Sequence, residues 1–453
     1  MRDWSPEQLA RAAGARLVAP APAGEAAPDG VARSGASPRE DAPGPVRTTI
    51  DSRDVGRGDL FVGLPGTRTD GGRYAGQALA QGAWGVLVSD EHARALTAQG
   101  APPGVLIASD EPLGALQRLA RSWRRELGAQ VVGITGSTGK TSTKDLLAAM
   151  LAQECSVVSS AQNLNTEIGL PLTILGAPAG TQVLVLEMAM RGAGQIAVLA
   201  AIAEPDVGVI VNVGPVHLEL LGSLQAVAAA KAELIDGLRP GATAVLPANE
   251  PLLEAHLREA LESVTFGPGG DVEQLDDLEL PFSSVHMRLN ALAALAAARA
   301  LGAQPSGRIE VTLSALRGQR IELPGQILVI NDCYNANPMS MRAALDDLAA
   351  SAPGRRVAVL GDMLELGPEE GRYHEQIGEY AREAGIDVLV AVGPLAARMG
   401  DRFEGELHRV EDGAAAAELT RDLLRPGDTV VIKASRGVGL EVVAEHLLAA
   451  TAE

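Results

Sequence analysis

A short glycine-rich segment carries the clearest chemical signal in this sequence. It spans Gly133 to Thr141, reads GITGSTGKT, and lies between an apolar stretch and a helical one. Glycines let backbone N–H groups wrap a phosphate and a helix start adds positive potential, so the segment predicts a phosphate-binding loop. A complete Walker A pattern has glycine where this chain has Ile134, so a chance lysine in a glycine-rich turn is the alternative. The residues expected to bind ATP here are Gly136, Ser137, Thr138, Gly139, Lys140, Thr141 and Ser142.

Three side chains in and after this loop suit a bound nucleotide and its metal ion. Lys140 is expected to reach the β- and γ-phosphates, and the Thr141 hydroxyl is expected to bind Mg²⁺. Glu187 ends the apolar run VLVLE, where a carboxylate can approach the same ion. A glutamate in such a turn is about as often simply solvated, so Glu187 alone decides nothing.

His217 and Lys231 follow the next apolar run, VGVIVNV. A lone histidine is usually structural. Lys231 lies in AVAAAKAEL, a predicted helix with mainly apolar neighbours, and a lysine there normally extends its amine to the surface. The amine is also the one side-chain group that can add CO₂ and become a carboxylate-like metal ligand. Both interpretations stay open at this point.

Lysine is rare in this chain. Of its 38 basic residues only Lys140, Lys144, Lys231 and Lys433 are lysine, and the others are arginine. Arginine can replace lysine wherever charge alone matters, so a retained lysine can mark a need for a compact or titratable amine. For Lys144 no role follows from the sequence, and a solvated helix position is expected.

Composition excludes several classes of protein. The net charge is −19, which disfavours nucleic acid as a partner because phosphate binding needs a basic face. Cys155 and Cys333 cannot form a disulfide framework, so a reducing, cytoplasmic location is expected. No run of 18 apolar residues occurs, so no membrane span is predicted.

The order of apolar strands and amphipathic helices predicts an α/β fold with three domains. We expect a small N-terminal α/β domain at 1–110, a central P-loop ATPase-type domain with a mainly parallel sheet at 111–316, and a Rossmann-like C-terminal α/β domain at 317–453. Residues 20–45 are dense in alanine, proline and glycine, which indicates a low-complexity loop.

Beyond the phosphate loop, ordered motifs extend over nearly the whole chain. They resemble the Mur ligase family, the ATP-dependent amino-acid ligases of peptidoglycan synthesis. The most specific strings, YNANP and LGDMLELG, favour the member that adds a dipeptide over those that add earlier residues. The motifs in chain order are DSR at 51–53, GITGSTGKTSTKD from 133, NLNTEIGLP at 163–171, Glu187, His217 with Lys231, NDCYNANP at 331–338, LGDMLELG at 360–367 and KASRG at 433–437.

The resemblance implies the reaction. The enzyme would join D-alanyl-D-alanine to the tripeptide carboxylate of a UDP-N-acetylmuramoyl-tripeptide through an acyl phosphate, using ATP and two Mg²⁺ ions. It implies a role in cell-wall biogenesis, cell shape and cell division, and a monomer is expected. In the family the lysine that aligns with Lys231 is carbamylated and holds the second Mg²⁺ together with the histidine that aligns with His217.

The resemblance also assigns residues. It implies a catalytic set of Lys140, Lys231, His217 and Glu187, and metal ligands Thr141, Glu187, His217 and Lys231. It adds Asn290, Arg320 and Asp332 to the ATP site. The implied substrate contacts are Ser52, Arg53, Asn163, Asn165, Thr166, Tyr334, Asn335, Asn337, Ser435 and Arg436.

Two alternatives stay open. One is another ATP-dependent amino-acid ligase, such as the diaminopimelate- or lysine-adding relative or a folate polyglutamate ligase. The other is a P-loop ATPase or kinase that forms no amide, which would not need the pair of His217 and Lys231.

Overall fold

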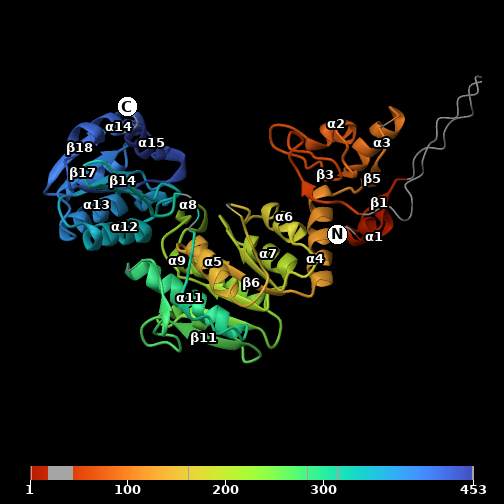
Figure 1. Ribbon diagram of the computed structural model, residues 1–453, viewed down its shortest axis with the longest axis horizontal. Coiled ribbons are helices and arrows are strands. Elements are labelled where there is room, and N and C mark those ends of the chain that lie inside the picture. Colours follow the sequence, from red (N-terminus) through yellow and green to blue (C-terminus); the bar gives the residue numbers. More distant parts are fainter. Residues whose placement is uncertain are drawn as a thin grey trace, which may run out of the picture. The chain divides into compact units, whose positions relative to one another are not determined.

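We analysed a computed structural model of the chain. It describes residues 1, 3–18, 44–100, 102–161, 163–282, 284–312, 314 and 316–450. The predicted low-complexity loop at 20–45 lies outside these residues except for its last two. The described residues form two compact units (Figure 1). The first holds Met1–Val131, Cys155–Met188 and Val198–Pro205, and the second holds Val132–Glu154, Ala189–Ala197 and Asp206–Glu453.

The first unit is built on a five-stranded sheet of order β1-β5-β4-β3-β2, in which only β1 is antiparallel. The strand β4 is apolar and buried along its whole length, as expected for a parallel strand covered on both faces. The parallel pair β7 and β8 also belongs to this unit. Its elements are α1 (Pro6–Ala12), β1 (Arg16–Leu17), β2 (Thr48–Thr49), β3 (Leu60–Val62), α2 (Ala75–Ala80), β4 (Gly85–Val88), α3 (Asp90–Ala98), β5 (Val105–Ala108), α4 (Pro112–Leu127), β7 (Val157–Ser159), α6 (Gly169–Gly176) and β8 (Val183–Glu187).

The second unit begins with the parallel strands β6, β9, β10 and β11. The helices α5 and α11 pack against each other beside them. Strand β6 (Gln130–Thr135) and helix α7 (Gln195–Ala203) have residues in both units. The other elements of this part are α5 (Lys140–Leu151), β9 (Val207–Ile210), α8 (Leu218–Leu221), α9 (Leu224–Asp236), β10 (Thr243–Pro247), α10 (Pro251–Glu254), β11 (Glu262–Phe266), β12 (Leu278–Glu279), α11 (Val285–Ala300) and β13 (Gly307–Arg308).

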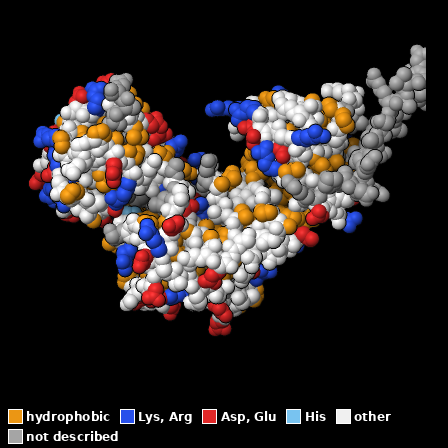
Figure 2. All heavy atoms as spheres, in the orientation of Figure 1, with side chains coloured by type: hydrophobic (Ala, Val, Ile, Leu, Met, Phe, Trp, Pro, Cys, Tyr) orange, Lys and Arg blue, Asp and Glu red, His pale blue; other side chains and the backbone are white. Residues whose placement is uncertain are grey.

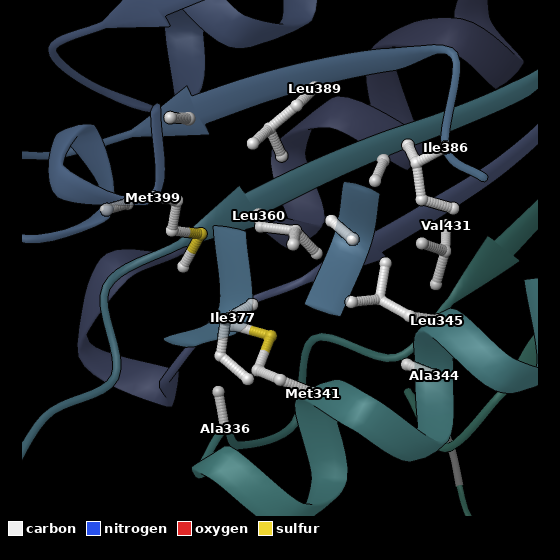
Figure 3. Close-up of a cluster of buried hydrophobic side chains, with 14 of the residues drawn as sticks. Ala336, Met341, Ala344, Leu345, Leu360, Ile377, Ile386, Leu389, Met399 and Val431 are labelled. Atoms are coloured by element: carbon white, nitrogen blue, oxygen red, sulfur yellow. The ribbon is translucent and has the colours of Figure 1, made fainter. Parts of the chain in front are cut away.

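The C-terminal part of the second unit is a six-stranded sheet of order β14-β15-β19-β16-β17-β18, parallel except at the β14 edge. Residues of its strands alternate between two hydrophobic clusters, one shared with α12 and α13 and one shared with α14 and α15. Figure 3 shows the first cluster, which includes Met341, Ile377 and Leu389. Its elements are β14 (Gln319–Leu323), β15 (Ile327–Asn331), α12 (Pro338–Ser351), β16 (Arg356–Gly361), α13 (Glu370–Glu383), β17 (Val388–Val392), β18 (Glu406–Val410), α14 (Gly413–Leu423), β19 (Thr429–Lys433) and α15 (Glu441–Ala449). Short 3₁₀ turns lie at Gly71–Tyr74, Gly367–Glu369, Ala396–Asp401 and Arg436–Val438.

The α/β fold class predicted from the sequence is confirmed, while the domain boundaries at 110 and 316 stay predictions. Helix α1 ends at Ala12, and the chain then turns through Gly14, which has a φ of 57°, into β1. On the face shown in Figure 2, acidic and basic side chains are interspersed. Of the helices in the described ranges, none is both long enough and apolar enough to cross a membrane.

Candidate active site

Glycine shapes the phosphate loop where α5 begins. Gly139 precedes the helix with a φ of 77°, a left-handed conformation that glycine adopts at little cost. A Cβ at this position would lie 2.3 Å from Oδ1 of Asn290, a buried residue of α11. The packing of α5 on α11 therefore brings Asn290 to the loop, and two groups predicted to bind ATP meet here.

Asn212 holds the same loop, and sequence analysis missed it. Its Oδ1 accepts hydrogen bonds from the backbone N–H groups of Ser137 and Thr138, at 3.1 and 3.0 Å. Its Nδ2 donates to the Thr138 carbonyl at 3.2 Å. The Ser137 hydroxyl donates to the Gly214 carbonyl at 3.0 Å, so the chain after β9 supports the loop at several points. The available signal was a polar residue directly after a buried strand that pairs with β6.

The remaining loop residues lie at the start of α5. The Lys140 amine donates to the Gly136 carbonyl at 2.9 Å, which folds the side chain back over the loop. Thr141 is buried and Ser142 is half-buried on the first turn. The loop, the lysine and the helix start thus have the arrangement expected for binding the phosphates of a nucleotide.

Lys231 lies on α9 and is 2% exposed, so the surface interpretation of this lysine is wrong. Burial, together with the positive charge of Lys140, holds the pKa of its amine well below the usual value. A neutral amine is nucleophilic and is the form that can add CO₂. A buried lysine whose pKa is held well below its usual value is therefore compatible with carbamylation, which stays a prediction.

His217 directly precedes α8 and lies within electrostatic reach of Lys140 and Lys231. Its Nδ1 is 2.5 Å from Oε2 of Glu365, a residue of the LGDMLELG string. Burial lowers the pKa of the imidazole, and the Glu365 carboxylate opposes that shift. Three of the four predicted catalytic residues are therefore neighbours, and the structure adds Glu365 to them.

These residues fit a divalent ion only if Lys231 is modified. Within the described ranges, no three His, Cys, Asp or Glu side chains form a group that could hold a metal ion. Mg²⁺ prefers oxygen ligands, and a carbamate on Lys231 would supply them next to the Nε2 of His217. The burial of the Lys231 amine, which lowers its pKa, and the contact of Glu365 with Nδ1 of His217 rather than with Nε2 are the observations that make this donor set suitable.

Glu187, the fourth predicted catalytic residue, ends β8 in the first unit and is buried, so the solvated alternative is wrong. Its Oε1 accepts a hydrogen bond from Nδ2 of Asn165 at 2.9 Å. Its backbone N–H donates to the Ser160 hydroxyl at 3.1 Å. Asn163 and Thr166 flank Asn165 in an exposed turn. The contact with Asn165 orients the Glu187 carboxylate, and its role toward Mg²⁺ stays a prediction.

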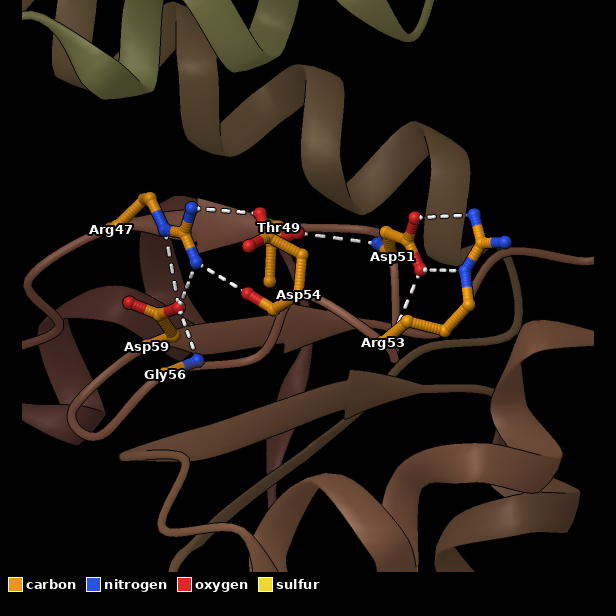
Figure 4. Close-up of polar contacts among 7 residues, drawn as sticks. All are labelled: Arg47, Thr49, Asp51, Arg53, Asp54, Gly56 and Asp59. Atoms are coloured by element: carbon orange, nitrogen blue, oxygen red, sulfur yellow. Dashed lines mark hydrogen bonds and ion pairs between the residues drawn. The ribbon is translucent and has the colours of Figure 1, made fainter.

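The DSR motif lies in a network of ion pairs in the first unit (Figure 4). Arg53 forms two side-chain contacts with Asp51, at 2.9 and 2.7 Å, and these lower the pKa of that carboxyl to about 2. The Arg53 side chain is nonetheless exposed, and Ser52 lies between the two residues, half-buried. Both predicted substrate contacts are therefore accessible to a ligand.

Lys433 holds the loop of the second unit that is predicted to bind the dipeptide. Its buried amine donates to Oδ2 of Asp332 at 2.5 Å and to the Asn335 carbonyl at 2.9 Å. Oδ1 of Asn337 caps α12 by accepting the Ser340 N–H at 2.9 Å, which leaves its Nδ2 for a substrate. The whole YNANP loop is thus held by β19 and α12.

The other candidates in this part have their own partners. Ser435 is buried and accepts the Leu364 N–H at 2.9 Å. Arg436 pairs with Glu441 at 3.1 Å and remains largely exposed. Arg320 pairs with Asp347 on α12 at 3.0 Å.

One further arginine lies beside a predicted substrate residue. The guanidinium of Arg317, which sequence analysis missed, stacks on the ring of Tyr334 at 3.9 Å. The electron-rich face of the Tyr334 ring attracts the positive charge of the Arg317 guanidinium and so holds the two side chains together.

Family models match three stretches of the chain. "Mur ligase family, catalytic domain" matches residues 47–124, "Mur ligase middle domain" matches 134–289, and "Mur ligase, glutamate ligase domain" matches 316–436. The stretches together contain the phosphate loop, the pair of His217 and Lys231, and the YNANP loop.

Curated relatives match over most of their length. A UDP-N-acetylmuramoyl-tripeptide–D-alanyl-D-alanine ligase from Synechocystis is 37% identical over 88% of this chain and 91% of its own. The Bacillus subtilis protein of that name is 34% identical over 88% and 92%. The Mycobacterium tuberculosis H37Rv protein of that name is 37% identical over 91% and 94%.

Solved structures agree with these relatives. A MurF from Acinetobacter baumannii superposes with a TM-score of 0.84 at 27% identity, covering 98% of this chain and 99% of its own. A MurF ligase from Thermotoga maritima in complex with ADP gives a TM-score of 0.77 at 30% identity, covering 88% and 96%.

Proposed function

This chain belongs to the Mur ligase family, and from that premise we propose that it joins D-alanyl-D-alanine to the tripeptide of UDP-N-acetylmuramoyl-tripeptide in peptidoglycan synthesis. The reaction is an ATP-dependent ligation, in keeping with the ADP-bound relative. The observation that carries the proposal is the match over about nine-tenths of the chain to relatives of that one name from distant bacteria.

The site supports a two-step route through an acyl phosphate. In the first step an oxygen of the tripeptide carboxylate attacks the γ-phosphorus of ATP, and the bond to the β-phosphate oxygen breaks to release ADP. In the second step the dipeptide amine attacks the acyl carbon, phosphate leaves, and the amine nitrogen loses a proton. Water competes with the dipeptide amine for the acyl phosphate, so the amide forms efficiently only if the amine and the acyl carbon are held together in the site.

Positive charge must be concentrated where two anions meet in a protein of charge −19. Lys140, the loop N–H groups and the start of α5 supply part of it from this chain. Thr141, Glu187, His217 and a carbamylated Lys231 would hold two Mg²⁺ ions, which when bound neutralise the developing charge on the transferred phosphate. Asn212 and Asn290 would fix the loop that presents these groups.

Residues from several stretches of the chain would contact the three substrates. Ser52 and Arg53 would contact the uridine nucleotide, and Asn163, Asn165 and Thr166 would contact the substrate close to Glu187. Asp332, Asn290 and Arg320 would contact ATP. The dipeptide would be bound by Tyr334, Asn335, Asn337, Ser435 and Arg436, and Arg436 is suited to its carboxylate because a guanidinium binds carboxylate through two parallel hydrogen bonds.

The test is product analysis by mass spectrometry. The purified protein is incubated with ATP, Mg²⁺, UDP-N-acetylmuramoyl-tripeptide and D-alanyl-D-alanine, and the expected products are the pentapeptide derivative, ADP and phosphate. Parallel reactions offer UDP-N-acetylmuramoyl-dipeptide with diaminopimelate or with lysine. Amide formation only in those reactions would indicate a different Mur-type ligase, and ATP hydrolysis without any amide would indicate a non-ligase ATPase.

A further inference from the structure

The loop that carries Glu365 is packed onto the turn that carries His217. Besides the 2.5 Å contact between the side chains, the Glu219 backbone N–H donates to the Glu365 carbonyl at 3.3 Å. A Cβ on Gly367 would lie 3.3 Å from the Glu219 nitrogen, so the loop approaches α8 closely. Two segments separated by 148 residues are therefore joined by side-chain and backbone contacts.

Both partners have unusual backbones. His217 has a φ of 52° and Glu365 a φ of 64°, in the left-handed region that residues with a Cβ seldom occupy. Such a conformation is strained for a residue with a Cβ and persists only where surrounding contacts enforce it. The strained positions coincide with the two side chains that meet, which indicates that their orientation is used.

The contact determines which nitrogen of His217 is free. A carboxylate accepts hydrogen bonds, so the proton of the neutral imidazole lies on Nδ1 and the lone pair lies on Nε2. The second oxygen of Glu365 is 3.8 Å from Nε of Arg191, which limits rotation of the carboxylate. A carboxylate on one ring nitrogen is the arrangement that fixes the tautomer and direction of a metal-binding histidine in many proteins.

We propose that Glu365 is a positioning residue that fixes the tautomer and the ring of His217 for a divalent metal ion. Glu365 lies in the loop between β16 and α13, and the predicted dipeptide contacts follow β15 and β19, strands of the same sheet. The C-terminal part of the chain, which would bind the incoming dipeptide, therefore also supplies the carboxylate that orients the His217 ring. This inference rests on the proposed function, because that function makes His217 a metal ligand.

The test compares Glu365→Ala with Glu369→Ala. Glu369 lies in the same loop region, is exposed, and pairs only with Arg372 at 3.0 Å among its described contacts. Mn²⁺ binding in the presence of ADP is followed by electron paramagnetic resonance. The bound Mn²⁺ ion that is present in the wild type and absent in His217→Ala identifies the site. We expect Glu365→Ala to raise the Kd of that site for Mn²⁺ about 10- to 100-fold and Glu369→Ala to leave this Kd unchanged.

A second measurement reads the tautomer directly. Nitrogen-15 NMR of the histidine rings, with His217→Asn for assignment, should show Nδ1 protonated in the wild type and in Glu369→Ala. A mixture of tautomers is expected in Glu365→Ala. Unchanged Mn²⁺ binding or an unchanged tautomer in Glu365→Ala would overturn the inference, as would a His217→Ala protein that binds Mn²⁺ normally. Neither measurement needs the peptide substrates, so failure of the wild type to form the amide would count against the proposed function alone.

Discussion

At the scale of single residues, the four lysines have one property in common. Lys144, Lys231 and Lys433 are buried and Lys140 is partly buried, although lysine is normally a surface residue. The expectation that Lys144 is solvated is wrong, because its amine contacts Asp145 at 2.5 Å in a buried setting. A chain that uses arginine for exposed charge has kept lysine where a compact amine fits and a planar guanidinium does not.

Lys231→Arg should lower kcat by about 100-fold or more, the size of loss seen when one group that stabilises developing charge is removed. Arginine carries a positive charge and cannot form the carbamate. The measurement is the rate of pentapeptide formation, with thermal unfolding to confirm that the protein is folded. Partial rescue of Lys231→Ala by formate, but not by chloride, should accompany the loss. An active Lys231→Arg protein would remove the carbamate from the mechanism.

At the scale of elements, the phosphate loop depends on the α5–α11 contact. Gly139→Ala should weaken ADP binding at least about tenfold, because the added Cβ meets Asn290 and forces a left-handed residue with a side chain. Gly302→Ala is the matched control, since it has a φ of 86° with nothing within 4 Å of the new Cβ. Both variants should lose some stability, but calorimetric titration should find normal ADP affinity in Gly302→Ala. Equal affinities in the two variants would refute the contact's importance.

The helix α13 carries a histidine that makes the fold sensitive to acid. His374 is fully buried, its Nε2 accepts the Met363 N–H at 2.9 Å, and burial lowers its pKa below the usual value. The folded protein therefore binds fewer protons than the unfolded chain below about pH 6.5, and each pKa unit of difference is worth about 1.4 kcal/mol. This stability is present above the unfolded pKa and is lost as the pH falls toward the folded one.

Denaturant unfolding at pH 7.5 and 5.5 tests whether stability falls with pH as predicted. The wild type should lose more unfolding free energy between the two values than His374→Gln, whose amide oxygen can accept the same N–H without titrating. Circular dichroism at pH 7.5 checks that the variant is folded. Identical losses in both proteins would show that another group controls the acid sensitivity.

At the scale of the whole molecule, the proposed function divides substrate binding among separate parts of the chain. Arg53→Ala should raise KM for the UDP-linked tripeptide about tenfold or more, the worth of one charge-assisted hydrogen bond. Arg436→Ala should do the same for D-alanyl-D-alanine. Each arginine is exposed and pairs with one carboxylate, so folding should be little affected. Each variant is the control for the other, and a variant that raised both KM values equally would contradict this division.

Much of the architecture follows from local pattern. An amphipathic run predicts a helix at 112–127, where α4 lies. Apolar runs predict strands at 326–331, 356–360, 387–392 and 429–433, within one residue of the bounds of β15, β16, β17 and β19, because burial on both faces leaves a continuous apolar run. No such run predicts a strand at β14 or β18. They form the two edges of the C-terminal sheet and are largely exposed, so their sequences lack the apolar run that marks a buried strand.

The sequence alone determined the phosphate loop, the family resemblance and the order of the motifs, because each is a short pattern of residue types with its own chemistry. Only the tertiary structure decided that Asn212 holds the loop from 74 residues away and that Glu365 meets His217 across 148. It also decided that Lys231 is buried, with a pKa well below its usual value, and that Lys144 is buried rather than solvated. These contacts arise from the packing of distant elements, and a side chain's neighbours, burial and pKa depend on that packing rather than on the residues beside it in the chain.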